Sequence, residues 1–348
     1  MCLRAEPCEV QRRWPRKCIQ YVENNLCGLE MAIPDDMNAA LEACYAECET
    51  RVDAYAAELD AVPPPSTIYH YTDSVGFRGI LESGMFRLTD IFALNDPAEL
   101  RHGIKYAGEI LDIEAKKGHP AAVIFARNFR EFVEEGAHKV ADFFVGCFSS
   151  ADDDLGQWRA YADNGQGFAL GFDGRLLEEA FATSEVDIKD NRTFPISYDE
   201  EKLQKIQGDL VRGTIPLIAL PAGRNMSNAD INEYIKALSI NFSIPTIRTA
   251  LFFKHKAYRN EDEYRFLQIR SVTAPKNDIR TRTRRYSTIR YVEFDWRKVA
   301  PSALKEIVIG PAAAIDDAEL FAENCRDLFL EYPTSVKIRR SGIPYRVS

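Results

Sequence analysis

A histidine at the end of a predicted strand opens the stretch of the chain that is richest in candidate chemistry. Residues 67–72 alternate in polarity and are rich in β-formers, so they predict a strand that ends in His70, Tyr71 and Thr72. The imidazole of His70 can hydrogen-bond a ligand or exchange a proton near neutral pH. Because a single histidine is more often a packed residue, this position alone supports either role.

A second stretch places two carboxylates and a guanidinium close together. Residues 263–269 predict a strand, on which Glu263 and Arg265 share one face because side chains alternate. Such a pair is either a structural ion pair or a site with a fixed negative charge. A nuclease or another phosphoesterase would instead need carboxylates that converge on a metal, for which the candidates are Asp96, Glu99, Glu261 and Glu263.

The elements between these stretches must bring them together. A short helix capped by Asp73 or Ser74 and stopped at Gly84 follows the first strand. Hydrophobic periodicity predicts further helices over 98–117, 121–139, 200–213, 228–242 and 316–330, and extended segments over 85–94, 142–150, 167–172, 193–198, 306–309 and from 336. This mixture of helices and strands predicts an α+β fold.

Composition and charge exclude several classes of function. The chain has 348 residues, of which 46% are hydrophobic, enough to bury one large core or two modest ones. A net charge of -9 and a pI near 5.3 argue against a protein that coats nucleic acid or membrane with its whole surface. No apolar run could span a bilayer and no signal core opens the chain, so we expect no membrane contact and a cytoplasmic location. The eight cysteines are widely spread and are expected to be reduced.

The first 65 residues predict a helical extension. Residues 34–62 carry apolar side chains at helical spacing and end at the prolines 63–65, which cannot continue a helix. This helix is expected to pack on the core domain or on a second subunit, so it is the candidate contact for a homo-oligomer or another partner. Residues 66–348 are expected to form a single core domain with a variable helical insertion near 174–250.

Two charged segments suggest contacts with other charged groups. The acidic run 152–154 precedes a helix, where negative charge offsets the helix dipole, so no metal is expected there. Residues 279–290 predict a hairpin that is either solvated or binds phosphates, which makes nucleic acid a candidate partner through Arg280, Arg282, Arg284 and Arg285. Common nucleotide-binding and hydrolase motifs are missing, and a hydrolase built on Cys147 and His70 would need the fold to join them.

The opening strand and helix resemble those of a known superfamily. The sequence I-Y-H-Y-T at 68–72, followed by G-I-L-x-S-G at 79–84, resembles the start of ADP-ribosyltransferase-like domains, particularly the bacterial enzymes that modify DNA bases. The resemblance implies a split, mostly antiparallel sheet with helices around it. It also implies that His70 holds the nicotinamide-side ribose of NAD.

Two glutamates extend this resemblance. Enzymes of that fold use a glutamate on a late strand, which gives Glu263 the role of stabilising the oxocarbenium-like state that forms as NAD loses nicotinamide, or of holding the ribose 2′-hydroxyl. Glu261 is similar to the first acid of an E-x-E pair, which orients the acceptor. The usual Ser-Thr-Ser signature is missing, and Ser149 with Ser150 replaces it only in part.

A longer resemblance covers roughly residues 66–347. The chain is similar there to an uncharacterised bacterial domain family, a domain of unknown function. The shared motifs are, besides the opening, N-D-P-x-E at 95–99, C-F-S at 147–149 with W-x-x-Y at 158–161, E-x-E-Y-R at 261–265 and I-x-x-G-P at 307–311. This family supplies no activity.

These resemblances imply an enzyme that consumes NAD by ADP-ribosyl transfer or hydrolysis, and a candidate bacterial toxin or defence effector. The expected catalytic residues are Glu263, His70 and Glu261. The expected NAD-binding residues are His70, Tyr71, Thr72, Asn95, Asp96, Ser149, Trp158, Tyr161 and Arg265. Of these, Trp158 and Tyr161 would stack on nicotinamide or adenine, or pack in the core. The alternatives are a non-catalytic module that binds a nucleotide or nucleic acid, and a metal-dependent nuclease.

Overall fold

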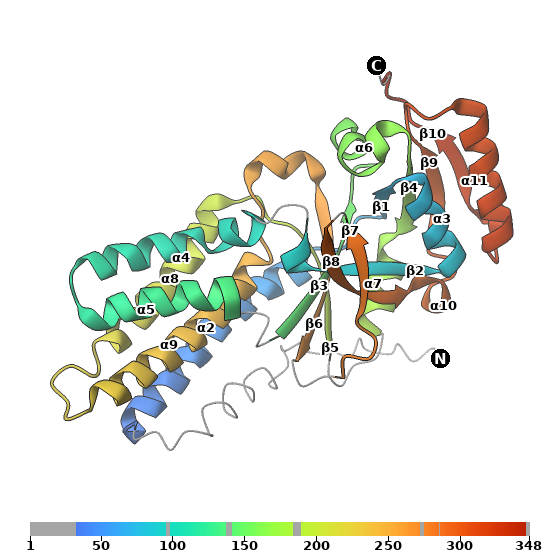
Figure 1. The fold of residues 1–348 in the computed structure, drawn as a ribbon. Coiled ribbons are helices and arrows are strands. Elements are labelled where there is room, and N and C mark those ends of the chain that lie inside the picture. The colour runs from blue at the N-terminus through green and yellow to red at the C-terminus, as the bar shows by residue number, and fades with distance from the viewer. Residues whose placement is uncertain are drawn as a thin grey trace, which may run out of the picture.

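A mixed, mostly antiparallel sheet with helices on both faces makes up this α+β protein (Figure 1). The computed structural model describes residues 33–94, 98–136, 141–183, 189–271, 275–284 and 286–345. The strands are β1 (Thr67–Thr72), β2 (Met85–Asp90), β3 (Ala141–Ser149), β4 (Phe168–Asp173), β5 (Lys189–Pro195), β6 (Glu263–Ser271), β7 (Arg280–Arg284), β8 (Ser287–Asp295), β9 (Leu304–Ile309) and β10 (Lys337–Arg340). Neighbouring strands follow the order β10-β9-β4-β1-β3-β2-β8-β7, and β6 lies between β3 and β5.

The sheet splits along one edge of β3. Residue by residue, β3 pairs with β6 on its other edge over its full length. On the split edge it meets β1 at its end, where Tyr69 faces Ser149, and it meets β2 nearer its start, where Thr89 faces Val145. Residues 146–148 lie between these two contacts and pair with β6 but with neither β1 nor β2. The split therefore opens a gap in the sheet beside the middle of β3.

A layer of long helices covers one face of the sheet (Figure 1, left). It contains α2 (Asp35–Asp60), α4 (Ala98–Lys116), α5 (Pro120–Glu131), α8 (Glu200–Ile218) and α9 (Asn228–Ala250). Apolar side chains from these helices form one buried cluster with residues of β3, β5 and β6. The guanidinium of Arg248 on α9 is buried and pairs with Glu49 and, at 2.6 Å, with Asp53 of α2. The apolar side chains that α2 buries and the ion pairs of Arg248 with Glu49 and Asp53 together hold α2 onto the layer.

A second set of helices covers the other side of the sheet. They are α3 (Ser74–Ser83), α7 (Gly174–Thr183), α10 (Trp296–Val299) and α11 (Ile315–Phe329), while α6 (Leu155–Tyr161) packs beside β1. Their core is rich in phenylalanine, with ring pairs such as Phe77 on Phe168 at 4.2 Å between centroids. Short helical turns complete the chain at Ile91–Ala93, Phe132–Gly136, Asp163–Gly165, Lys256–Glu261 (η5) and Pro333–Ser335. None of the helices in the described ranges has the length and apolar character that crossing a bilayer requires.

Most predicted elements are confirmed, and the exceptions concern where the elements begin and end. Asp73 caps α3 and Gly84 ends it in a left-handed conformation with φ of 71°, as predicted. The helices α8 and α9 continue beyond their predicted ends. Each runs through a proline, Pro216 in α8 and Pro245 in α9, although sequence rules place a proline outside the interior of a helix. The helix predicted over 316–330 begins at Ile315, with Ala314 in the cap position and Asp316 in the first turn.

The ends of two further elements, a helix and a strand, differ from the prediction. The helix predicted over 121–139 ends at Glu131 and passes into a wider turn, and residues 137–140 lie outside the described ranges. The strand predicted over 193–198 begins earlier and ends at Pro195. Although α2 packs within its own chain, the division of the chain after residue 65 and a contact of this helix with a second subunit stay predictions.

A close approach of two helices in the layer gives a stability test. A Cβ added to Gly103 on α4 would lie 2.4 Å from Cβ of Ala250 on α9, whereas one added to Gly108 of the same helix meets nothing within 4 Å. We expect Gly103→Ala to lower the free energy of unfolding by about 1–3 kcal/mol through overpacking. Gly108→Ala should raise it by about 0.5–1 kcal/mol. Urea unfolding of both variants measures the difference, and equal effects would contradict this helix contact.

Candidate functional site

A cavity of about 690 Å³ lies at the split in the sheet. Its wall includes residues of β1, α3, β2, β3, α6 and η5. The predicted site residues that line it are His70, Tyr71, Thr72, Ser149, Tyr161, Glu261 and Glu263. The fold thus brings together side chains that are far apart in the sequence, such as His70 and Glu263. The volume of the cavity suits a ligand of the size of a nucleotide.

His70 spans the gap that the split leaves beside β3. Its Nδ1 lies 3.1 Å from the carbonyl oxygen of Cys147, so this nitrogen carries a proton and donates it. The ring packs against Phe86 and Phe148, with centroid distances of 5.4 and 5.6 Å. Burial lowers the pKa of His70 below its usual value of 6.5. His70 is therefore neutral at pH 7, and its Nε2 can accept a hydrogen bond.

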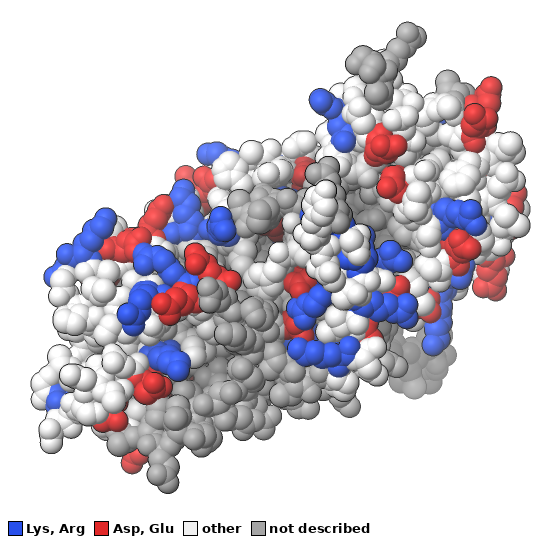
Figure 2. Space-filling model, viewed as in Figure 1, with Lys and Arg blue, Asp and Glu red and all other residues white. Residues whose placement is uncertain are grey.

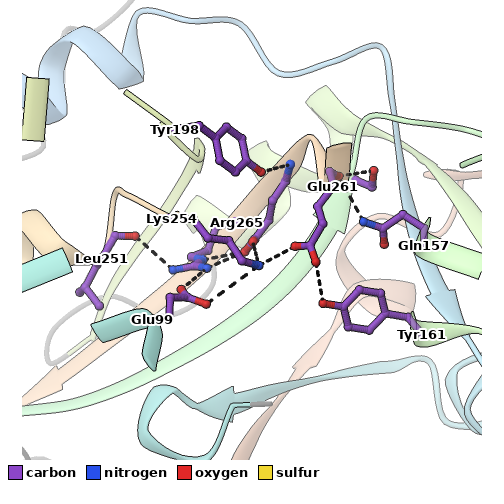
Figure 3. Close-up of polar contacts among 10 residues, drawn as sticks. Glu99, Gln157, Tyr161, Tyr198, Leu251, Lys254, Glu261 and Arg265 are labelled. Atoms are coloured by element: carbon purple, nitrogen blue, oxygen red, sulfur yellow. Dashed lines mark hydrogen bonds and ion pairs between the residues drawn. The ribbon is translucent and has the colours of Figure 1, made fainter. Parts of the chain in front are cut away.

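Glu261 is held at the cavity wall from several sides. One carboxylate oxygen accepts a hydrogen bond from the Tyr161 hydroxyl at 3.0 Å, and the other contacts the Lys254 ammonium at 2.5 Å (Figure 3). The backbone oxygen of Glu261 accepts from the Ser149 hydroxyl at 2.6 Å and from the Gln157 amide at 3.3 Å. The side chain keeps 12% of its surface exposed. Its position is thus fixed while its carboxylate still reaches the cavity.

A buried ionic network lies directly behind Glu261 (Figure 3). Glu263 contacts Arg265 at 2.7 Å and Lys254 at 2.9 Å, so both of its oxygens are engaged. Arg265 also contacts Glu99 of α4 at 2.6 Å and donates to the Leu251 carbonyl at 3.2 Å. Although burial alone would raise the pKa of Glu263, the charges of Arg265 and Lys254 lower it to about 2. Burial would likewise lower the pKa of Lys254, but its neighbouring glutamates raise it above the usual range.

The charges of this network do not cancel. Three carboxylates, those of Glu99, Glu261 and Glu263, share the two cations of Lys254 and Arg265. With all five groups ionised, one negative charge is left over. Glu261 has the largest exposed fraction of the three carboxylates, at 12% against 7% and 3%. The surplus charge therefore faces the cavity.

Some predicted ligand residues do not reach the cavity. Trp158 is fully buried, its indole donates to Asp153 at 2.7 Å, and its ring packs edge-on against Tyr71, so it cannot stack on a ligand. Arg265 is also fully buried and acts through Glu263. The structural ion pair predicted for Glu263 and Arg265 is confirmed. The predicted positions Asn95 and Asp96 lie outside the described residues.

Lys254 and Cys147 are the cavity residues whose surroundings sequence reasoning missed. Lys254 stands in the charged run K-H-K before E-x-E, a signal for a charged corner but not for contact with two glutamates. The side chain of Cys147 has surface that is exposed to the cavity. The protein around the cavity nevertheless shields the thiol from bulk water, and this desolvation raises its pKa well above 9.0. His70 contacts the backbone of Cys147 rather than its sulfur. This geometry does not supply the activated thiolate of a Cys–His hydrolase.

The outer part of the cavity carries the opposite charge. Arg87 of β2 and Arg282 and Arg284 of β7 line the cavity, and their exposure to solvent places them toward its outside. Figure 2 shows basic side chains gathered over this region of the molecule. Burial and the neighbouring charges of Arg87 and Arg284 lower the pKa of Arg282, which reflects the crowding of like charges. The cavity is thus negative at its inner wall and positive toward its outer part.

Two groups of described side chains are candidates for binding a metal ion. The described carboxylates proposed for a nuclease, Glu99, Glu261 and Glu263, converge on the Lys254 ammonium, which a metal ion would have to replace. Elsewhere in the described ranges, ligand atoms come within 4.8 Å of one another in the group His102, Glu200 and His255.

Neighbouring groups in this second cluster compete with a metal. Lys256 lies 3.5 Å from the Glu200 carboxylate, and the Ala257 backbone donates to Nδ1 of His255 at 3.1 Å. A metal bound through Nε2 would require that Nδ1 to carry a proton instead. His102 is half-buried, with its ring centroid 5.0 Å from that of His255. We assign no metal to this group.

Comparison with known proteins finds a family match over part of the chain but no activity. A family model described as a protein of unknown function (DUF2971) matches residues 157–266. No curated protein and no solved structure matches the chain. The matched segment begins in α6 and ends in β6, and it includes Tyr161, Lys254, Glu261, Glu263 and Arg265 of the site. Over these residues, the chain is similar to an uncharacterised domain family. This segment of the chain contributes Lys254, Glu261 and Glu263 to the inner, charged wall of the cavity.

Proposed function

We propose that the cavity binds NAD and that the protein breaks the bond between nicotinamide and ribose, with transfer of ADP-ribose to water or to an acceptor. The observation that carries this proposal is the arrangement of charge in the cavity. A surplus carboxylate stands at the inner wall and arginines stand toward the outside. NAD has the matching arrangement, because its nicotinamide ring is cationic and its diphosphate is anionic.

The inner wall suits the chemistry of this bond. As the bond from C1′ to the ring nitrogen breaks, nicotinamide leaves with the electron pair and positive charge develops on the ribose. A carboxylate that is fixed and ionised beforehand stabilises this charge without reorganising. Glu261 meets this requirement, because Tyr161 and Lys254 hold its two oxygens in place and its carboxylate still reaches the cavity. Water then adds to C1′ and releases one proton to solvent.

Glu263 and His70 are given supporting roles in this proposal. Both oxygens of Glu263 are engaged by cations, so we assign it the positioning of Lys254 and Arg265 rather than direct contact with the ribose. His70 is neutral and can accept a hydrogen bond from a ribose hydroxyl through Nε2. The arginines Arg87 and Arg282 then lie toward the diphosphate. An acceptor other than water would approach past β7, whose arginines favour a nucleic acid.

The biological setting that such chemistry implies is a bacterial toxin or defence effector that consumes cytoplasmic NAD. Loss of NAD would stop metabolism in the cell that contains the active protein. This assignment follows from the proposed reaction.

One observation favours a second function, a module that binds a nucleotide without turning it over. The carboxylate that the resemblance makes catalytic, Glu263, is saturated by Lys254 and Arg265 and has a pKa of about 2. A network of this kind also serves as a rigid wall for recognition. In this case the cavity would bind NAD or another nucleotide saturably, and no product would form.

Mass spectrometry of the purified protein incubated with NAD separates these functions. We expect release of nicotinamide and formation of ADP-ribose from NAD but not from NADH, whose reduced ring is uncharged and is a poor leaving group. Addition of DNA, RNA or cell lysate reveals the acceptor as a mass increase. Saturable NAD binding by calorimetry without nicotinamide release, from a folded sample, would favour the binding module. The absence of both binding and release would overturn the proposal.

A further inference from the structure

The strand β7 concentrates positive charge in a chain whose net charge is negative. The chain has a net charge of -9, yet β7 reads R-T-R-T-R and all five of its residues are exposed. Arg280, Arg282 and Arg284 share one face because side chains alternate along a strand. Since β7 ends the strand order of the sheet, one of its edges has no neighbouring strand among the described residues. A partner can therefore approach this face and this edge from solvent.

The arginine face of β7 continues the outer part of the cavity. Arg282 and Arg284 line the cavity, so the face that they share with Arg280 is turned toward it. Glu293 contacts Arg280 at 3.1 Å and Arg87 at 3.9 Å, one carboxylate between two guanidinium groups. Positive charge therefore exceeds negative charge along this face, and it attracts polyanions.

An aromatic side chain stands at the tip of the same hairpin. Tyr286 lies between β7 and β8 and is fully exposed, at 104% of its reference surface. Its ring contributes no burial to the fold, although a tyrosine ring is a large apolar surface. Arginines followed by a solvent-exposed aromatic ring are what single-stranded nucleic acids require, namely cations for phosphates and a platform on which a base can stack.

We propose that the β7–β8 hairpin binds single-stranded nucleic acid, with Arg280 and Arg284 on its phosphates and Tyr286 stacked on a base. The Cα atoms of Arg280 and Arg284 are separated by roughly 13 Å along the strand, a length that an extended nucleic-acid strand covers in a few nucleotides. Stacking on Tyr286 needs an unpaired base, which a duplex does not present. The bound strand then passes the cavity that Arg284 lines.

Fluorescence anisotropy with labelled single-stranded DNA and RNA, at several salt concentrations, tests this proposal. Tyr286→Ala is expected to weaken binding roughly tenfold or more, while Tyr286→Phe keeps the ring and should retain it. Arg280→Gln with Arg284→Gln should reduce the slope of log affinity against log salt by about 1.4, because each lost phosphate contact removes about 0.7. DNA and RNA arms of the titration show which sugar the surface accepts.

Matched controls separate this surface from unspecific charge effects. Arg175 is exposed on α7, outside the residues that line the cavity, so Arg175→Gln should leave both affinity and slope unchanged. The proposal is overturned if Tyr286→Ala binds as well as wild type, if Arg175→Gln equals the hairpin variants, or if a duplex or phosphatidylserine vesicles bind in preference to a single strand. These titrations contain no NAD, so their failure is distinct from a failure to release nicotinamide.

Discussion

Glu261→Gln is expected to lower the rate of nicotinamide release by about 100- to 1,000-fold, the usual effect of removing one preorganised electrostatic group. The amide keeps the shape of the side chain and can still accept from Tyr161, but it removes the surplus negative charge at the inner wall. Because positive charge grows on the ribose as the transition state forms, kcat should fall more than KM rises. Steady-state kinetics with nicotinamide quantified by mass spectrometry gives both constants.

The control for this variant is a glutamate far from the cavity. Glu42 is exposed on α2, and Glu42→Gln should keep wild-type kinetics. Thermal unfolding of all three proteins shows whether the fold is retained. Wild-type kcat in Glu261→Gln would contradict the role given to this carboxylate, as would a loss of activity that merely parallels a loss of folded protein.

Arg265→Met is expected to lower the free energy of unfolding by about 3–5 kcal/mol, because it leaves the carboxylates of Glu99, Glu261 and Glu263 to share the single cation of Lys254. Arg265 is fully buried and contacts Glu99 at 2.6 Å and Glu263 at 2.7 Å. Methionine fills a similar volume, so the effect comes mainly from the missing charge. Urea unfolding measures it, and Arg259→Met, at an exposed position in η5, should change stability by less than about 0.5 kcal/mol.

The effect of Arg265→Met should also depend on pH in a defined direction. In the wild type the pKa of Glu263 is about 2, below its usual 4.5, so its ionised form adds stability above pH 4.5 that is lost as the pH falls toward 2. Without Arg265, only Lys254 offsets the burial of Glu263, and it is shared with Glu99 and Glu261, so we expect burial to raise that pKa above its usual value. The variant then regains stability as acid protonates the carboxylate, and its deficit should be smaller at about pH 5 than at about pH 7.5. A deficit that grows between these values on acidification would contradict this account.

Local patterns predicted the elements of the fold better than their exact ends. The strand with His70, the helix from Asp73 to Gly84 and the strand that begins at Glu263 follow from alternation, capping and turn residues, which act over a few positions. The extra turns of α9 beyond Pro245 depend on burial in the helical layer, because tertiary packing offsets the hydrogen bond that a proline cannot make. Such compensation is invisible in a short window of sequence.

Convergence in space explains what could and could not be predicted of the site. Spacing alone indicated the pairing of Glu263 with Arg265, since two residues on one strand determine it. The contact of Arg265 with Glu99, 166 positions away, needs the packing of α4 on the sheet. Trp158 shows the reverse case, because a one-turn spacing from Tyr161 places both on α6 but does not decide which ring faces the cavity.

The helical layer contributes one cation and one anion to the inner wall, Lys254 just after α9 and Glu99 from α4. Because these two charges cancel, the helical layer affects where the surplus negative charge of the inner wall lies but not its amount. Lys254 stands between Glu261 and Glu263 and lets two like charges remain neighbours. A substitution at either of these two positions would therefore move charge at the cavity wall, whereas a substitution on the outer surface of the helices would leave that charge in place.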